Sequence, residues 1–171
     1  KPLKLGTQQW KDGRLTSLSL SNNAQSLKGE IPQSVGNLTQ LTSLISTWNK
    51  FTGSIPDTIK HLINLTHLEI TYGELSGGIP VIIGNLEKLE ELNLANNKFT
   101  GSIPPEIGNL TSLTTLDLSY NGLDSIPDAI GNLTDLTNLY LNSNNLTGTI
   151  PEAIGNLTNL TYLHLGYNQH T

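Results

Sequence analysis

The sequence contains no cysteine and no methionine, and only 13% of its 171 residues are charged. The absence of cysteine excludes disulfide bonds, thiol catalysis and cysteine-ligated metal centres. Charged residues normally make up about a quarter of a soluble protein, so their scarcity is unusual. The net charge is −5, and Lys and Arg form no run. Nucleic acid is therefore not an expected partner, because phosphates require clustered cations.

Long hydrophobic runs are also missing. None approaches the ~20 residues that a membrane-spanning helix requires. No signal peptide is recognisable, and the chain begins at Lys1 rather than at a methionine. We therefore expect it to be a processed or excised part of a longer product. Its 171 residues give room for one domain with a core of useful size.

A repeat of about 24 residues dominates the sequence. Its most regular copy, residues 89–112, reads L-x-x-L-x-L-x-x-N-x-F-T-G-x-I-P-x-x-I-G-N-L. Seven copies start at Leu15, Leu41, Leu65, Leu89, Leu113, Leu136 and Leu160. A period in the twenties is typical of a stacked solenoid. We predict an N-terminal capping segment at residues 1–14, in which Trp10 covers the apolar end of the stack. Residues 15–171 are the repeats, and the last is truncated.

Each repeat predicts a short strand, a turn, an extended Ile-Pro segment and a helical or 3₁₀ turn. Leucines alternate with polar residues in Leu92-Asn93-Leu94, as in a half-buried strand, and neighbouring strands would pair in parallel. The glycine of I-G-N-L suits a turn that ends with a positive φ. One asparagine per repeat would form a buried ladder that bonds to backbone groups, interrupted at Gly73. Its members are Asn23, Asn49, Asn97, Asn121, Asn144 and Asn168.

The whole pattern resembles the plant-specific class of leucine-rich repeats. This class occurs in the ectodomains of plant receptor kinases and in polygalacturonase-inhibiting proteins, and similar repeats occur in protist and bacterial surface proteins. The resemblance runs from Leu15 to the end, and the lead-in from Trp10 to Thr16 is similar to the family's W-x-G-x-V-T. It implies an α/β repeat fold, a curved leucine-rich repeat solenoid. One parallel β-sheet would form its concave face and 3₁₀ or helical turns its convex face.

The concave face of such a solenoid would carry Trp48 and all five tyrosines. Exposed aromatic residues anchor protein interfaces and also stack on sugar rings. The alternative is ordinary cross-strand packing of residues that favour strands. The candidate ligand-binding residues are Trp48, Tyr72, Tyr120, Tyr140, Tyr162, Tyr167, Glu69 and Asp117.

Glu69, Glu91 and Asp117 come from three successive strands and could in principle serve acid–base chemistry or a hard cation. We expect neither, because an open face provides no burial that would shift their pKa values. His67 and His164 are about four repeats apart and cannot share a metal. No nucleophile–base pair or phosphate loop stands out. The sequence therefore predicts no catalysis, no metal site and no cofactor.

Asn-Leu-Thr, an N-glycosylation acceptor pattern, recurs on the convex and lateral surface. The repeat consensus itself contains this triplet, so turn geometry and leucine burial also account for it. In a eukaryotic secretory protein we would expect some copies to be modified. The seventh copy, at Asn145, is expected to be less accessible because it precedes a core leucine. The candidates are Asn37, Asn64, Asn109, Asn132, Asn156 and Asn159.

We interpret the chain as a secreted or cell-surface recognition module that binds a protein, a peptide or a carbohydrate on its concave face. The alternative is a structural segment of a glycosylated, self-assembling fibre, adhesin or cell-wall protein. There the unpaired edge at residues 163–165 would associate head to tail. Two further alternatives are ice binding through regular Thr and Asn rows and, by family analogy alone, inhibition of a wall-degrading enzyme.

Overall fold

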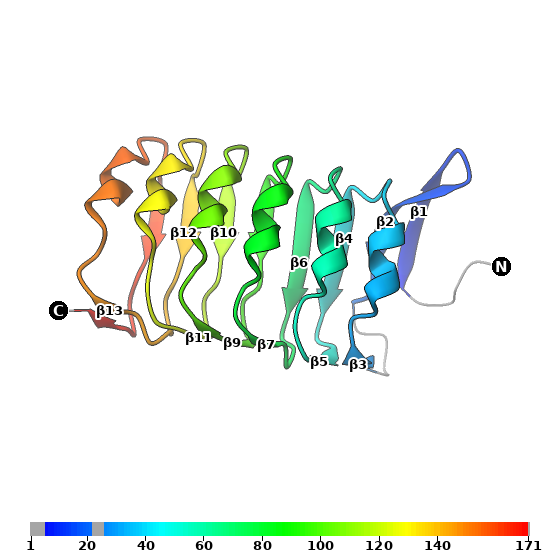
Figure 1. Cartoon of the computed structure of the whole chain (residues 1–171), viewed down its shortest axis with the longest axis horizontal. Helices are drawn as coiled ribbons and strands as arrows, with labels where there is room; N and C mark the ends of the chain where they lie inside the picture. The colour runs from blue at the N-terminus through cyan, green and yellow to red at the C-terminus, as the bar shows by residue number, and fades with distance from the viewer. Residues whose placement is uncertain (1–5, 22–25, 171) are drawn as a thin grey trace.

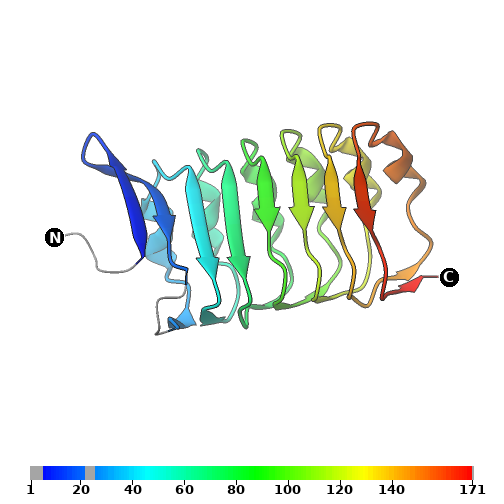
Figure 2. The ribbon, with the colours of Figure 1, turned by 180° about the vertical axis from the view of Figure 1, so that it is seen from behind.

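The computed structural model describes residues 6–21 and 26–170 (Figure 1). The repeats stack side by side into a solenoid, with the two termini at opposite ends. The first six repeats each contribute a strand to one long sheet, a 3₁₀ helix on the opposite side, and a short strand at the edge between them. Within the described residues, the seventh repeat contributes the two strands and no helix. Figure 2 shows the long sheet from its solvent side. The predicted solenoid of parallel strands and 3₁₀ turns is confirmed.

The long sheet has eight strands in the order β1-β2-β4-β6-β8-β10-β12-β14. From β2 onward all neighbours pair in parallel, whereas β1 pairs antiparallel with β2. The strands are β1 (Thr7–Lys11), β2 (Arg14–Ser19), β4 (Ser43–Thr47), β6 (His67–Thr71), β8 (Glu91–Asn93), β10 (Thr115–Asp117), β12 (Asn138–Tyr140) and β14 (Tyr162–His164).

A proline in extended conformation precedes every 3₁₀ helix, which fits a residue that lacks an N–H and has a fixed φ. The helices are η1 (Gln33–Asn37), η2 (Asp57–His61), η3 (Val81–Asn85), η4 (Pro105–Asn109), η5 (Asp128–Asn132) and η6 (Glu152–Asn156). The short edge strands are β3 (Lys28–Glu30), β5 (Lys50–Thr52), β7 (Ser76–Gly77), β9 (Lys98–Gly101), β11 (Gly122–Leu123), β13 (Thr147–Gly148) and β15 (Gln169–His170).

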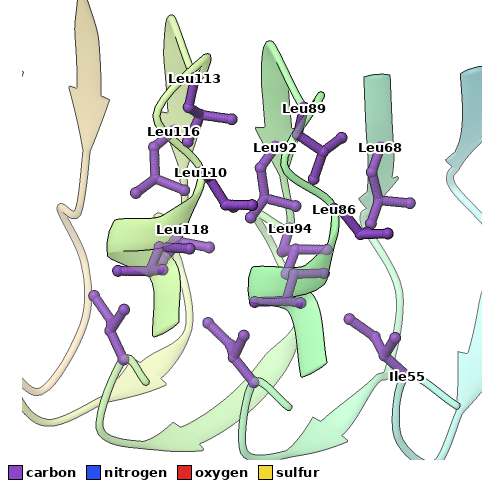
Figure 3. Close-up of a cluster of buried hydrophobic side chains, with 14 of the residues drawn as sticks. Ile55, Leu68, Leu86, Leu89, Leu92, Leu94, Leu110, Leu113, Leu116 and Leu118 are labelled. Atoms are coloured by element: carbon purple, nitrogen blue, oxygen red, sulfur yellow. The ribbon is translucent and has the colours of Figure 1, made fainter. Parts of the chain in front are cut away.

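The core consists of leucine and isoleucine side chains that repeat in layers between the sheet and the 3₁₀ helices. Leu89, Leu92 and Leu94 of the fourth repeat are fully buried, and Figure 3 shows them aligned with the matching leucines of the next repeat. Each layer packs against the layers before and after it. Burial is complete in the middle of the stack and partial in the first and last repeats.

The predicted asparagine ladder is present. Asn97 Oδ1 accepts a hydrogen bond from the Leu75 N–H at 3.1 Å, and Nδ2 donates to the carbonyls of Ile70 and Leu94 at 2.7 and 3.2 Å. Each side chain thus bonds to backbone groups of its own repeat and of the preceding one, which would otherwise be buried without partners. Asn23 lies outside the described residues. Four other asparagines make the equivalent bonds: Asn49, Asn121, Asn144 and Asn168.

Threonine hydroxyls form a second ladder, which the sequence pattern did not reveal. Each hydroxyl donates to the carbonyl at the same position of the preceding repeat, at 2.9 to 3.1 Å. This ladder runs along the start of the long-sheet strands and ties neighbouring repeats together. Its donors are Thr42, Thr66, Thr114, Thr137 and Thr161.

The prediction of positive φ for the I-G-N-L glycines is wrong. Within the described repeats, the glycines with positive φ lie in the segment before the Ile-Pro pair instead, as Gly53 and Gly101 do. Gly108 has a different constraint, because a Cβ there would lie 2.5 Å from the carbonyl oxygen of Ala129 in the next repeat. Glycine therefore permits close packing of consecutive 3₁₀ helices. Lys60 takes this position in the second repeat, and η2 and η3 pack less closely than the other neighbouring helices.

The N-terminal end is covered by a strand that the repeat pattern did not predict. Strand β1 pairs along the edge of β2, and Trp10 lies opposite Leu15 in this pairing with 56% of its surface exposed. The role of Trp10 as a cap stays a prediction. Strand β2 begins at Arg14. The division into a capping segment of residues 1–14 and repeats from residue 15 stays a prediction.

Replacement of Asn97 by alanine tests the ladder. Asn97→Ala leaves the Leu75 N–H and the Ile70 carbonyl without partners in a buried environment, and we expect unfolding to become easier by about 2 to 4 kcal/mol. Urea unfolding followed by circular dichroism measures this loss. Asn145→Ala is the matched control, since Asn145 is exposed and outside the ladder. An Asn97→Ala loss no larger than that of the control would show that the ladder contributes little.

Candidate recognition surface on the concave face

The solvent side of the eight-stranded sheet, here called the concave face, carries the candidate residues on neighbouring strands. The central row runs through Ile45, Glu69, Asn93, Asp117, Tyr140 and His164, which are register partners from β4 to β14. A second row includes His67, Glu91 and Tyr162. The rim row comprises the residues just before the ladder asparagines, beyond the strand ends: Trp48, Tyr72, Asn96, Tyr120, Ser143 and Tyr167. Asn22 has the equivalent sequence position in the first repeat and lies outside the described residues.

All six described residues of the rim row have a left-handed backbone, with φ between 52° and 58°. Asparagine tolerates this conformation well, whereas bulky side chains adopt it at a cost of about 1 kcal/mol or more. Nevertheless Trp48, Tyr72, Tyr120 and Tyr167 occupy this position, and 45% to 83% of their surface is exposed. Burial in the core does not explain them.

Trp48 and Tyr72 form a parallel stack. Their ring centroids are 3.8 Å apart and the planes differ by 10°. The stack joins the ends of β4 and β6, and Trp48 remains 56% exposed. Stacking holds both rings in one orientation, so the pair presents a preformed apolar surface at the rim.

A second aromatic cluster lies at the other end of the concave face. The Tyr140 and Tyr162 rings are 4.9 Å apart and tilted by 36°, and the His164 ring meets Tyr162 edge-on at 6.4 Å. Tyr162 is 47% exposed. The structure thus brings four candidate aromatics together in two pairs. Tyr120 and Tyr167 take no part in either described pair.

Between the two aromatic clusters lie the three carboxylates. Asp117 Oδ1 accepts hydrogen bonds from the Ser119 N–H and hydroxyl, at 2.9 and 2.6 Å, and Glu69 Oε1 accepts a longer one from Thr71 at 3.4 Å. Burial raises the pKa of the Glu69 carboxyl above its ordinary value, and the charges of Glu91 and Asp117 raise it further, against the Thr71 hydrogen bond. The expectation that no burial shifts a carboxylate here is therefore wrong for Glu69.

Among the described residues, the three rows contain no Lys or Arg that could balance these charges. The Lys98–Glu74 ion pair, at 2.9 Å, lies at the lateral edge of the solenoid. In residues 6–21 and 26–170 no group of three or more His, Asp or Glu residues is arranged to hold a metal ion. The concave face is thus an acidic surface flanked by two aromatic clusters.

The candidate glycosylation residues differ in accessibility. Five of the six are exposed, namely Asn37, Asn109, Asn132, Asn156 and Asn159. Asn64 is half-buried, and its Nδ2 donates to the Thr39 carbonyl at 3.0 Å. The expectation for Asn145 is wrong, because its side chain is exposed. Glycosylation itself stays a prediction.

Comparisons with known proteins support the assignment by repeat pattern. A model described as "Leucine-rich repeat region" matches residues 93–170, and one described as "Leucine Rich Repeat" matches residues 14–38. A chain of the BIR3–SERK2 complex from Arabidopsis thaliana is 34% identical, with a TM-score of 0.70, over 80% of this chain and 71% of that one. The chain belongs to the leucine-rich repeat family. Its repeats are of the plant type.

Two further solved structures are similar over most of this leucine-rich repeat chain. The Arabidopsis receptor kinase HAESA, in complex with the peptide hormone IDA and the co-receptor SERK1, is 41% identical with a TM-score of 0.84. The match covers 91% of this chain and 26% of that one. A plant ice-binding protein is 28% identical with a TM-score of 0.83, over 99% of this chain and 70% of its own. A search of curated protein sequences gave no match.

The leucine-rich repeat chain spans only part of the receptors that it resembles. It covers between 19% and 27% of the length of the first matched ones, among them the ectodomain of the plant membrane receptor kinase GASSHO1/SCHENGEN3. Four of these five receptors were solved in complex with a second molecule, as RGFR1 was with RGF2. Within the described residues, no helix is long and apolar enough to cross a membrane.

Replacement of Glu69 by glutamine tests the electrostatics of the concave face. A raised pKa means that ionisation of Glu69 destabilises the folded state, so this penalty is absent below the ordinary glutamate pKa and develops as pH rises through the folded pKa. We expect Glu69→Gln to stabilise the protein at pH 7, by less than about 1 kcal/mol because Glu69 is half exposed. Urea unfolding of Glu69→Gln and of the unaltered protein at pH 3 and pH 7 measures this difference in the free energy of unfolding. If Glu69→Gln is more stable by the same amount at both pH values, the pKa of Glu69 is not raised in the folded state.

Proposed function

We infer that the concave face binds an extended peptide, or an extended segment of a protein, that carries a basic side chain between apolar ones. The observation that supports this most is the exposed Trp48–Tyr72 stack at left-handed backbone positions. Asn96 occupies the same position in the fourth repeat, so the scaffold does not require aromatic residues there. Exposed aromatics retained at a conformational cost are typical of binding residues.

The charges of the concave face favour a basic ligand. Glu69, Glu91 and Asp117 repel one another, and the rows around them contain no cation. A lysine or arginine side chain of the ligand would relieve this repulsion and would form charge-assisted hydrogen bonds. The basic residue of the peptide would then lie over the third to fifth repeats, next to these three carboxylates.

The spacing of the two aromatic clusters sets the length of the ligand. Trp48 lies in the second repeat and Tyr162 in the seventh, five strand spacings away, which corresponds to about 24 Å at ~4.8 Å per parallel strand. Tyr162 is in register with Ser43, five residues before Trp48, which adds about 16 Å along the strands and gives a separation of about 29 Å. An extended peptide covers that distance with about nine residues. Its apolar side chains contact the Trp48–Tyr72 stack at one end and the Tyr140–Tyr162 pair at the other.

The similar receptors agree with this function. HAESA was solved with the peptide hormone IDA and a co-receptor, and the peptide hormone receptor RGFR1 was solved with RGF2. We also propose that this chain is secreted or lies at the cell surface, and that it has no catalytic activity. Tyr120 and Tyr167 lie outside the two aromatic clusters. We propose that they contact a partner larger than the peptide, such as a second protein. Carbohydrate binding and head-to-tail self-association stay predictions.

Selection from a library of random displayed peptides tests the proposal directly. We expect bound peptides to be enriched in Lys or Arg next to aromatic or aliphatic residues. Trp48→Asn and Tyr72→Asn should each weaken a selected peptide about tenfold or more, because each removes a central aromatic contact. Asparagine already fits this backbone at Asn96, so folding should be preserved. Glu69→Gln should weaken binding roughly three- to tenfold and reduce its salt dependence.

The matched control is Ile63→Ala. Ile63 is an exposed apolar residue, 57% accessible, that lies between η2 and β6 rather than on the concave face. We expect it to leave peptide affinity unchanged. Selected peptides without basic residues, or binding that survives both asparagine substitutions in folded protein, would refute the proposal. Binding of a glycan array that requires Trp48 and Tyr72 would instead assign the face to carbohydrate.

A second candidate function is ice binding, which the match to a plant ice-binding protein over 99% of the chain favours. The surface available for it is the lateral edge, where Thr52, Thr100 and Thr147 are exposed at equivalent repeat positions. The threonines of the hydroxyl ladder along the long sheet are less suitable, since their hydroxyls already donate to backbone carbonyls.

Thermal hysteresis of the purified protein tests the ice-binding candidate. If the lateral threonines bind ice, Thr100→Lys should abolish most of the hysteresis, because a charged side chain disrupts a flat, regular surface. Trp48→Asn should leave hysteresis intact, since it alters a different surface. Absence of hysteresis in the unaltered protein would remove this candidate and leave the peptide proposal unaffected.

A further inference from the structure

We propose that a cavity beneath the second repeat binds a compact, neutral, apolar molecule that carries one hydrogen-bond acceptor. The cavity has a volume of about 260 Å³ and lies inside the solenoid, on the opposite side of the sheet from the concave face. Its walls include Leu20, Val35, Leu44, Ser46, Phe51 and Ile70, from the first three repeats. The site is therefore separate from the peptide surface and independent of its function.

The sequence explains why the cavity exists. The third inward position of each strand holds leucine or isoleucine in the other six repeats, whereas the second repeat has Ser46. In the other repeats the residue between the two inward side chains is usually polar. Here the apolar Ile45 is at that outward position and the polar Ser46 is at the inward one. Ser46 is only 3% exposed and lies between Leu20 and Ile70. The space that a leucine side chain would fill thus connects the first repeat with the third.

The turn of the third repeat also departs from the consensus next to the cavity. By the pattern of the other repeats, an asparagine at position 73 would accept from the Phe51 N–H and donate to the Ser46 carbonyl, yet this position is Gly73. A Cβ at Gly73 would lie 2.7 Å from Asn97 Oδ1, so the neighbouring ladder member occupies part of the room. Two consensus residues are therefore replaced around Ser46 and Phe51, both of which line the cavity.

The lining defines the chemistry of the ligand. No charged side chain lines the cavity, and its polar side chains are Ser34, at an exposed position, and the buried Ser46. Ser46 Oγ accepts a hydrogen bond from Asn49 Nδ2 at 2.9 Å. In the described part of the chain Ser46 donates no side-chain hydrogen bond, so its hydroxyl hydrogen can be donated to a ligand carbonyl. An ionised ligand would be strongly disfavoured here, because its charge would have no partner.

The cavity has a mouth and a floor. Pro32 and Ser34 are exposed and Leu20 and Val35 half-buried, so the cavity opens through the first repeat. Leu44, Ser46 and Ile70 are buried and form the floor. An apolar cavity of about 150 Å³ in a protein core stays dry and binds benzene, so this larger one can hold a bicyclic molecule. Filling such a space restores contacts that the floor residues lack.

Fluorescence titration with N-phenyl-1-naphthylamine, a neutral probe that brightens in apolar surroundings, tests the site. We expect saturable one-to-one binding to the intact chain. Ser46→Leu and Ser46→Ile restore the side chain of the other repeats, and each should weaken binding about tenfold or more, since the probe must displace it. Both variants should also be more stable than the unaltered protein, which keeps the test independent of folding.

A pair of competitors of equal shape tests the hydroxyl. Camphor, a bicyclic ketone, should displace the probe roughly three- to tenfold better than bornane, the hydrocarbon without its carbonyl, as one net hydrogen bond implies. Ser46→Ala should remove this preference while the probe still binds. Trp48→Asn controls for binding to exposed aromatics and should have no effect. Absence of saturable binding, or binding that neither Ser46→Leu nor Ser46→Ile weakens, would overturn the proposal.

Discussion

The turn after each strand of the long sheet buries a backbone N–H and a backbone carbonyl that no strand pairing can satisfy. In five of the repeats an asparagine side chain bonds to both groups, as Asn97 does with Leu75 and Ile70. Because each bond spans two repeats, the ladder fixes the offset between neighbours as well as the turn within one. The leucine layers, the close glycine contacts between 3₁₀ helices and the threonine ladder all depend on that constant offset. An unpaired buried amide would cost about as much as a large core truncation, so the ladder leaves little freedom elsewhere in the turn.

The same constraint creates the positions that carry the proposed function. In the same turn, the residue before the ladder position adopts a left-handed backbone in every described repeat from the second onward, and its side chain lies at the rim of the concave face. The rim row is thus a set of rigidly placed side chains whose identity the core does not determine. Asn96 is the residue that the backbone prefers, and Trp48 and Tyr72 are the departures from it. A rigid scaffold lowers the ordering cost of binding, which is why aromatics at these positions can provide affinity despite their conformational strain.

Much of the fold could be predicted from the repeat. The period of about 24 residues predicts a solenoid, the alternation of leucines with polar residues predicts strands, and the asparagine column predicts a ladder of hydrogen bonds to the backbone. The sequence also identified the concave residues by their column. It did not reveal how they pair, since the Trp48–Tyr72 stack and the Tyr140–Tyr162 pair depend on side-chain rotamers across two strands. The role of Gly108 was misassigned, because its reason is a contact with the next repeat rather than its own φ. For Glu69 the sequence showed three nearby carboxylates, but only packing around the strand determines how far burial shifts the pKa.

The departures from the consensus gather in the second and third repeats: Ile45-Ser46, Trp48, Lys60-His61 and Tyr72-Gly73. Since incomplete packing and strained backbone are destabilising, we expect each to lower the stability of the core, the turn or the helix packing. A solenoid tolerates this because every repeat contacts only its neighbours, so the cost stays local. The fourth and fifth repeats, with complete leucine layers and ladder bonds, lie next to the weakened pair and support it. The aromatic stack, the raised pKa of Glu69 and the Ser46 cavity consequently occur side by side, in the part of the stack where stability has been exchanged for exposed or incompletely packed side chains.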